Sequence, residues 1–300
     1  MSPSPSTRPW SPLVTEFALV GGLLVGVTLW YRLVGRLLRV VGSGSSLLRD
    51  GALFGTLFLG GLVVGAAVYV AARHVHVGLA RPAWSERWTL AAAGAVPAVL
   101  VACTKLVGVV TGVPYNSLTL TAVAASPPLG PIVALSALTL AVRVPALVVV
   151  SQVLIQGSFE RAGGDALAAV ATTLVTAFAL VDTTGTVAPA PDVGKLAALV
   201  ALMGALVVYR AVATRTDRRR VRFLAAIPFV AGLGVVALAA VVSVTSVAGA
   251  LFALTQVATF GVAAEAYRRT DSLVSPALAY ACLLVANRVV VVSEAGAQAW

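Results

Sequence analysis

Nine apolar runs, each long enough to cross most of a lipid bilayer as a helix, constrain the fold of this chain more than any other feature. The hydrocarbon core of a bilayer is about 30 Å thick, and a helix needs roughly 20 residues to cross it. The runs lie near residues 13–31, 51–72, 89–110, 131–155, 165–181, 195–209, 223–242, 246–267 and 273–292. Open sheet edges cannot face lipid, and the runs lack the alternating pattern of a β-barrel. We therefore expect an all-α, polytopic transmembrane helical bundle with about eight or nine spans.

The composition excludes a soluble globular protein. Of the 300 residues, 59% are hydrophobic and only 11% are charged, whereas a soluble domain is about half apolar and about a quarter charged. The net charge of +10 could suggest nucleic-acid binding. The basic residues, however, stand in short loops between the apolar runs and have no interleaved aromatic residues. We expect the lipid bilayer and, beyond it, other membrane proteins as partners, and no nucleic acid.

The distribution of Lys and Arg predicts a multi-pass protein of the cell membrane with a cytoplasmic N-terminus, because cytoplasmic loops carry an excess of basic residues. The first dozen residues, 1–12, are rich in Pro and Ser and are expected to form a disordered tail. The first loop is basic yet falls outside in this topology. The segment 113–131 is the one expected not to span. One cytoplasmic cluster is expected to contact lipid headgroups or a partner, and it consists of Arg215, Arg218, Arg219, Arg220 and Arg222.

Three basic residues fall inside apolar runs, where a charge is expensive and usually faces the bundle interior or a wet cavity. They are Lys105, Arg143 and Arg288. Together with the Pro-rich segment 113–131, they leave open the interpretation that the protein is a small transporter or permease.

The most distinctive stretch is 260–287, where two apolar helices are joined by a polar turn. From Arg269 it reads R-T-D-S-L-V-S-P-A-L-A. It resembles the last two core helices of the CPBP family, the intramembrane metalloproteases that include the type II CAAX prenyl endopeptidases and the Abi proteins. In that family R-T-G-S-L and a Pro precede a metal-binding His, which is followed four residues later by Asn or Asp. Tyr280 stands at the His position here, and Leu284 stands at the Asn position.

The segment 149–164 aligns with the family motif E-E-L-L-F-R-G. Ser151 and Gln152 replace the two Glu residues, Gln156 replaces the Arg, and Gly157 keeps the Gly. In the family a Glu of this motif is thought to activate the metal-bound water. An amide cannot accept a proton at neutral pH, so the resemblance implies a site that has lost its general base.

The remaining family motif is a Phe followed four residues later by a metal-binding His. Phe178-Ala-Leu-Val-Asp182 fits with Asp182 at the His position, and Phe252-Ala-Leu-Thr-Gln256 is a weaker alternative. The resemblance divides the chain into N-terminal transmembrane helices, 13–144, and CPBP-like core helices, 145–293. A helix pair near 195–242 is then an insertion.

The resemblance thus implies a membrane scaffold, adaptor or regulator that is catalytically silent. Its vestigial site would consist of Ser151, Gln152, Gln156, Asp182, Tyr280 and Leu284. We expect no cofactor and no metal, because a catalytic zinc needs about three protein ligands and a base. An active CPBP-type metalloendopeptidase with atypical residues, which would bind zinc, stays open as an alternative, as does the transporter.

Overall fold

The computed structural model describes residues 12–41, 46–121, 129–182, 184–185, 187–216 and 218–297. The expected tail, 1–12, lies outside this range except for Pro12, and so do residues 122–128 of the segment expected not to span. Within the described part the long helices are α1 (Pro12–Val41), α2 (Leu47–Arg73), α3 (Arg87–Thr111), α5 (Leu129–Val148), α7 (Asp165–Leu180), α8 (Val193–Arg215), α9 (Arg219–Val242), α10 (Val247–Thr270) and α11 (Val274–Ala297). The shorter elements are η1 (Trp84–Glu86), α4 (Tyr115–Thr119), η2 (Val149–Gln156) and α6 (Gly157–Gly163). The described residues form no strand beyond one isolated bridge between Leu79 and Ser272.

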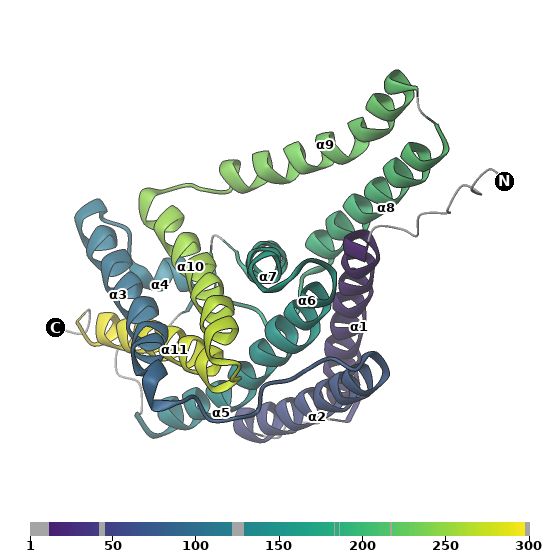
Figure 1. Ribbon diagram of the computed structural model, residues 1–300. Coiled ribbons are helices and arrows are strands. Elements are labelled where there is room, and N and C mark those ends of the chain that lie inside the picture. The colour runs from purple at the N-terminus through teal and green to yellow at the C-terminus, as the bar shows by residue number, and fades with distance from the viewer. Residues whose placement is uncertain are drawn as a thin grey trace.

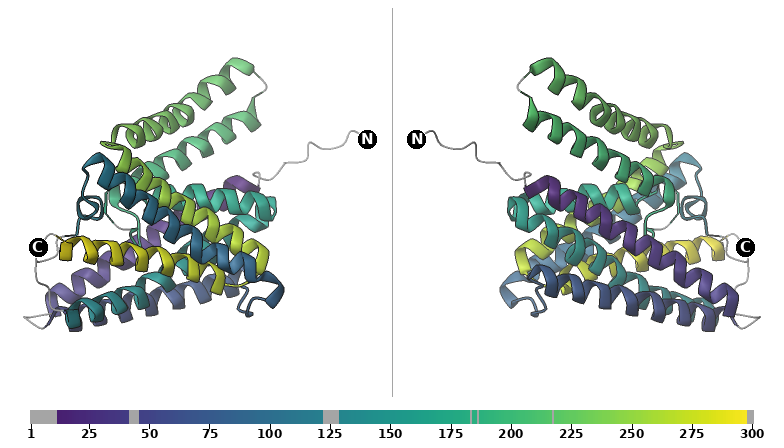
Figure 2. Two further views of the ribbon diagram at one scale, coloured as in Figure 1. Left: turned by 90° about the vertical axis from the view of Figure 1, so that its left-hand side faces the viewer. Right: turned by 90° about the vertical axis from the view of Figure 1, so that its right-hand side faces the viewer.

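The prediction of an all-α membrane bundle is confirmed. Eight helical stretches in the described residues are long and apolar enough to cross a membrane, and α5, η2 and α6 form one of them, Gly130–Gly163. The one apolar run that is not among these eight stretches, 165–181, forms α7, a shorter apolar helix of 16 residues. In Figure 2 the first turn of α1 and the last turn of α11 lie at opposite ends of the bundle.

The core of the bundle is formed by α3, η2, α7, α10 and α11 (Figure 1). Helix α10 packs against α3, α7 and α11, and η2 packs against α7 and α10. Helix α1 closes the other side by packing on α2, α6 and α8. The residues with the lowest exposure therefore gather around η2, α7, α10 and α11.

Helices α8 and α9 form a hairpin at the edge of the bundle. The two helices pack mainly against each other, and α9 has no buried residue. Figure 2 shows the hairpin standing apart from the remaining helices. This hairpin covers the region in which the sequence suggested an inserted helix pair, near 195–242. Its apolar side chains, such as Phe223, 70% exposed, and Leu238, 63% exposed, are suited to contact lipid.

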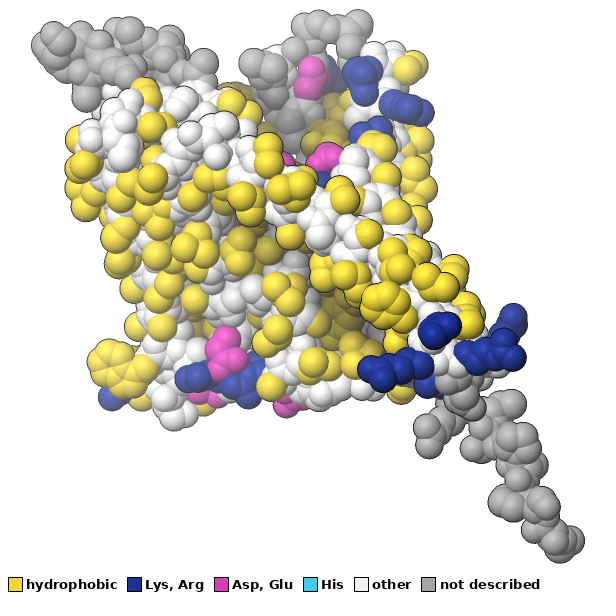
Figure 3. Space-filling model, turned by 90° about the horizontal axis from the view of Figure 1, so that it is seen from above, with side chains coloured by type: hydrophobic (Ala, Val, Ile, Leu, Met, Phe, Trp, Pro, Cys, Tyr) yellow, Lys and Arg dark blue, Asp and Glu magenta, His cyan; other side chains and the backbone are white. Residues whose placement is uncertain are grey.

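Basic side chains lie at two opposite edges of the molecule, and mostly apolar side chains cover the face between them (Figure 3). This banding is typical of a protein that crosses a bilayer, because charges stay in the headgroup region. The connection between α8 and α9 carries the cluster Arg215, Arg218, Arg219 and Arg220, all of them exposed, and Arg222, which is partly buried. Arg222 donates from Nε to the carbonyl of Thr216 over 2.7 Å.

The turn between α10 and α11 is held by the segment that follows α2. Asp271 caps α10 in the left-handed conformation, with φ of 43°. The N–H of Leu273 donates to the carbonyl of Gly78 over 2.9 Å, and Ser272 Oγ donates to the carbonyl of Ala80 over 2.5 Å. His76 Nε2 lies 2.9 Å from Asp271 Oδ2. Through these contacts the turn sets the position of α11, and hence of Tyr280.

Candidate functional site: a buried polar centre

A π-helical segment interrupts the long helix that runs from α5 to α6. In η2 the backbone bonds shift to the i to i+5 pattern, and the N–H of Gly157 closes the segment on the carbonyl of Gln152. Gly157 allows a close approach here, because a Cβ on it would lie 2.6 Å from Val75 Cγ1. Single π-turns inside α-helices are rare and often mark functional sites. This segment carries three of the candidate residues, Ser151, Gln152 and Gln156.

Ser151, Gln152 and Tyr280 form one hydrogen-bonded group that joins η2 to α11. Ser151 Oγ lies 2.8 Å from Tyr280 OH. Gln152 Nε2 donates to Tyr280 OH over 3.1 Å and lies 3.3 Å from Ser151 Oγ. Each of the three residues is at most 1% exposed. A tyrosine hydroxyl and two polar side chains that are about 130 positions away in the sequence thus meet inside the bundle.

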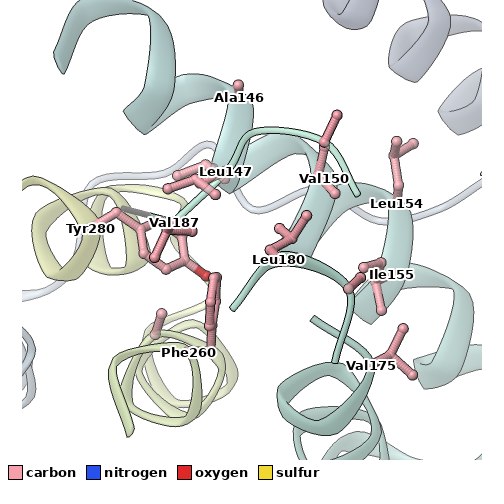
Figure 4. Close-up of a cluster of buried hydrophobic side chains, with 14 of the residues drawn as sticks. Ala146, Leu147, Val150, Leu154, Ile155, Val175, Leu180, Val187, Phe260 and Tyr280 are labelled. Atoms are coloured by element: carbon pink, nitrogen blue, oxygen red, sulfur yellow. The ribbon is translucent and has the colours of Figure 1, made fainter. Parts of the chain in front are cut away.

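Apolar side chains from four elements enclose this group (Figure 4). Leu147 lies beside the ring of Tyr280, and Val187 approaches it from the segment that follows α7. The Phe260 ring of α10 packs against the Tyr280 ring, with centroids 5.5 Å apart. The hydroxyl of Tyr280 points into the cluster, where water is excluded. A hydrogen bond in such a place is stronger than in water, and an unpaired polar atom is more costly.

The helices around the hydrogen-bonded group hold several buried polar atoms without a hydrogen-bond partner in the described part of the chain. They are Gln152 Oε1 and Gln156 Oε1 of η2, Thr172 Oγ1 and Thr176 Oγ1 of α7, and both amide atoms of Gln256 of α10. Buried polar atoms in proteins are nearly always paired. Such a concentration on three helices that pack together marks this region as one able to accept hydrogen bonds from a polar group or donate to it. We refer to these residues, together with Ser151 and Tyr280, as the polar centre.

The other predicted site residues lie outside the hydrogen-bonded group of Ser151, Gln152 and Tyr280. Gln156 is fully buried and donates to Glu160 Oε1 over 3.1 Å. Leu284, 8% exposed, lies one turn after Tyr280 and lines a separate cavity between α4, α5 and α11. Asp182 is exposed, and its carboxylate lies 2.5 Å from Lys195 Nζ. The hydrogen-bonded group therefore contains three of the six positions predicted for the vestigial site. Asp182 is not one of them.

The place of Asp182 has a simple cause. The spacing from Phe178 to Asp182 aligns two side chains only if the helix continues, but α7 ends at Leu180. Val181 is extended, with φ of −94° and ψ of 132°, so the chain turns away from the helix axis before Asp182. Gln256, the weaker alternative, is fully buried and lies one helical turn before Phe260 on the same face of α10.

Two residues of the polar centre, Thr172 and Thr176, were not recognised in the sequence. The signal that could have identified them is a spacing of four residues between polar side chains inside an apolar helix, which places both on one face. The same spacing relates Gln152 to Gln156. Threonine is common in membrane helices, where its hydroxyl usually bonds to the carbonyl one turn earlier, so this signal alone has little specificity.

The residues of the polar centre do not fit a zinc ion. Zinc in proteins is held by His, Cys, Asp or Glu side chains, and the centre offers hydroxyls and neutral amides. The described residues contain no group of three or more such ligands anywhere. His76 contacts Asp271 outside the polar centre, and Glu265 is paired with Arg268 and Arg269.

Neither a protein-family model, a curated protein nor a solved structure matches this chain. Eight helices long and apolar enough to cross a membrane, within the described residues, make the chain a multi-pass membrane protein.

Proposed function

We propose that this integral membrane protein is a catalytically silent relative of the CPBP intramembrane proteases, which acts as a scaffold, adaptor or regulator of other membrane proteins. The observation that supports this proposal is the contact between Ser151, Gln152 and Tyr280. The resemblance aligns these residues with the Glu pair and the metal-binding His of the family, and side chains descended from one metal site must face one another. Their hydroxyl and amide groups are 2.8 to 3.1 Å apart at Tyr280 OH.

The turn before α11 supports the same alignment. The family has Gly in R-T-G-S-L where this chain has Asp271, and Asp271 adopts a positive φ of 43°. Glycine adopts this conformation without strain, and Asp is among the few other residues that tolerate it. A substitution of Gly by Asp therefore preserves the local backbone.

The chemistry of the polar centre favours holding over hydrolysis. Amides and hydroxyls donate and accept hydrogen bonds at neutral pH but do not take up a proton from water. The side chains of the polar centre on η2, α7 and α10 lie in the closed interior of the bundle, where each is at most 1% exposed. The role that follows is that of a scaffold, adaptor or regulator of other membrane proteins.

A cleavage assay in proteoliposomes tests the proposal against the active-protease alternative. The substrate is a farnesylated peptide with a C-terminal C-a-a-X sequence, which the resemblance suggests. We expect no cleavage by the wild type and none by Tyr280→His, because one His does not complete a ligand set. Chelator-sensitive cleavage by the wild type would establish the alternative.

A further inference from the structure

The hairpin of α8 and α9 buries side chains only near its base. Helix α8 has two buried residues in the described part of the chain, Leu199 and Met203. Met203 packs on α1, where a Cβ on Gly21 would lie 2.2 Å from its sulfur atom. From residue 204 to residue 242, a stretch that we call the arm, no described residue is buried. Packing in the core therefore fixes the base of the hairpin but not the arm.

The far end of the arm lies at the depth of the phosphate groups of a bilayer. Helix α8 has 23 residues and α9 has 24, so at a rise of 1.5 Å per residue each is about 35 Å long. The hydrocarbon core is about 30 Å thick, and each helix is therefore long enough to cross it with little to spare. The residues that join the two helices, 214–222, lie just outside the hydrocarbon. We call these residues the hairpin tip.

The hairpin tip concentrates positive charge. Five arginines and one aspartate give it a net charge of +4. The aspartate, Asp217, lies outside the described residues, and Arg222 donates from Nε to the carbonyl of Thr216. The other four arginine side chains are exposed and make no hydrogen bond or ion pair with a described residue, and they are Arg215, Arg218, Arg219 and Arg220. These four guanidinium groups are available to a ligand outside the chain.

The start of α9 also favours a negative charge at the hairpin tip. Its N-cap residue, Arg218, makes no side-chain cap, and its first turn contains no acidic residue. Arg219 and Arg220 occupy the first two positions of the helix instead. The N-terminus of a helix carries a partial positive charge, where cations are unfavourable and anions are stabilising. An anion at the hairpin tip would therefore compensate both the arginines and the helix end.

The residues that follow favour a lipid over a protein as the source of this anion. Phe223 and Leu224 come directly after Arg222, and both are exposed. A phospholipid presents a phosphodiester and then an acyl chain in the same order along the membrane normal. Arginine binds phosphate groups through two parallel N–H donors, and basic residues next to a membrane span are typical of sites for anionic lipids.

We propose that the hairpin tip binds the phosphodiester groups of anionic lipids through Arg215, Arg218, Arg219 and Arg220, and that these lipids hold the arm in place beside the bundle. The sequence alone left a lipid and a protein partner open for these arginines. The depth of the tip, its free guanidinium groups and the exposed apolar residues after it favour the lipid. The inference is independent of the polar centre, because none of these residues belongs to it.

The lipid composition around the hairpin tip is measured on the full-length protein in nanodiscs. A fluorophore is attached to Thr214→Cys, an exposed position of the tip, in a chain that also carries Cys103→Ala and Cys282→Ala. The phosphatidylcholine nanodiscs contain a small fraction of nitroxide-labelled phosphatidylglycerol or of nitroxide-labelled phosphatidylcholine, which quenches the fluorophore on contact. We expect a preference for phosphatidylglycerol of about fivefold for each arginine that binds it, since a basic residue near an anionic membrane contributes about that factor. The preference should decrease as added salt shortens the Debye length.

Replacing all four arginines of the site with glutamine should abolish the preference for phosphatidylglycerol. The matched control has the same net charge but replaces four exposed arginines outside the hairpin, and it combines Arg32→Gln, Arg36→Gln, Arg39→Gln and Arg49→Gln. The control should keep the preference at the hairpin tip. Equal quenching by the two lipids in the wild type would overturn the proposal and leave a protein as the ligand of the tip. Equal losses in the two quadruple variants would also overturn it, because they would reflect the net charge of the whole protein.

A second variant guards against the case in which four glutamines disturb the hairpin tip. Lysine at the same four positions keeps the charges and should keep most of the preference, because lysine binds phosphate as a point charge. Loss of the preference in the lysine variant would refute binding by charge. The holding of the arm is measured by hydrogen exchange at the hairpin tip, which phosphatidylglycerol should slow in the wild type but not in the glutamine variant. Exchange in the wild type that is the same with and without phosphatidylglycerol would contradict the holding role.

Discussion

Removing one oxygen atom from the polar centre, by the substitution Tyr280→Phe, tests whether the contact between η2 and α11 stabilises the fold. The phenylalanine ring keeps the packing against Phe260, whose centroid is 5.5 Å away. The substitution deletes the hydroxyl that lies 2.8 Å from Ser151 Oγ and accepts from Gln152 Nε2 over 3.1 Å. The change is therefore a loss of hydrogen bonding with little change in volume.

The remaining contacts set the size of the expected effect. Ser151 Oγ keeps its bond to the carbonyl of Leu147, at 2.5 Å, and Gln152 Nε2 keeps its contact with Ser151 Oγ, at 3.3 Å. No buried donor is left without any partner, so the loss is that of ordinary hydrogen bonds, about 1 kcal/mol. Hydrogen bonds between membrane helices average about 0.6 kcal/mol in double-mutant cycles, which points to the same range. For a chain of this length the melting temperature should fall by roughly 2 °C.

The assay is reversible unfolding in mixed detergent micelles, and the matched control is Tyr209→Phe. Tyr209 is a partly buried tyrosine of α8 whose hydroxyl makes no hydrogen bond within the described residues. The control should stay within about 0.3 kcal/mol of the wild type, as substitutions that remove no contact usually do. A double-mutant cycle of Tyr280→Phe with Ser151→Ala should give a coupling of about 0.6 kcal/mol. A coupling near zero, or equal effects of Tyr280→Phe and Tyr209→Phe, would refute the reasoning.

Three further predictions concern the turn, the unpaired amide and the topology. Gly78→Ala should destabilise the protein by about 2 kcal/mol in the same unfolding assay, because the new Cβ would lie 1.9 Å from the carbonyl oxygen of Asp271. The control Gly60→Ala on α2, whose new Cβ meets nothing within 4 Å, should not destabilise the protein in this way. Equal losses of stability in the two variants would contradict the contact between Gly78 and Asp271. Gln256→Met should stabilise the folded protein by about 1 kcal/mol, since it replaces a buried amide whose two polar atoms lack partners in the described part of the chain. A clear loss of stability in this variant would mean that the amide is hydrogen-bonded. Single cysteines at Arg219 and Arg269 should react with a membrane-impermeant maleimide from the same side, because two spans, α9 and α10, separate them; labelling from opposite sides would exclude one of these spans.

The positions of the helices could be predicted from the sequence because the membrane allows few alternatives. Each apolar run must form a helix to pair its backbone groups, and nine runs gave the nine long helices of the described residues. The segment 113–131, expected not to span, contains in its described part the short helix Tyr115–Thr119 and the first residues of α5, and residues 122–128 lie outside the described residues. The contact of this short helix with Glu294 of α11 was not predicted. Glu294 pairs with Lys105, which is 189 positions away, and such a pairing leaves no local pattern in the sequence.

The details of the polar centre were harder to predict. A π-helix depends on which carbonyl each N–H selects, and the apolar pattern of 149–156 is the same for α and π geometry, so η2 had no signal. The placement of Asp182 failed because the sequence did not reveal that α7 ends at Leu180. The meeting of Ser151, Gln152 and Tyr280 came from the resemblance, since no periodicity relates positions so far apart. Sequence patterns thus predicted the elements, and tertiary contacts decided which polar side chains converge.

The zinc content of the purified protein is the measurement that tests the central claim most directly. The claim is that the polar centre has the arrangement of a metalloprotease site but not its chemistry, because hydroxyls and amides replace the zinc ligands and the base. The wild-type protein, purified without a metal-affinity tag from zinc-supplemented cells, is analysed by mass spectrometry of the element. We expect no stoichiometric zinc in the wild type or in Tyr280→His. One zinc ion per wild-type chain, together with chelator-sensitive peptide cleavage, would contradict the account.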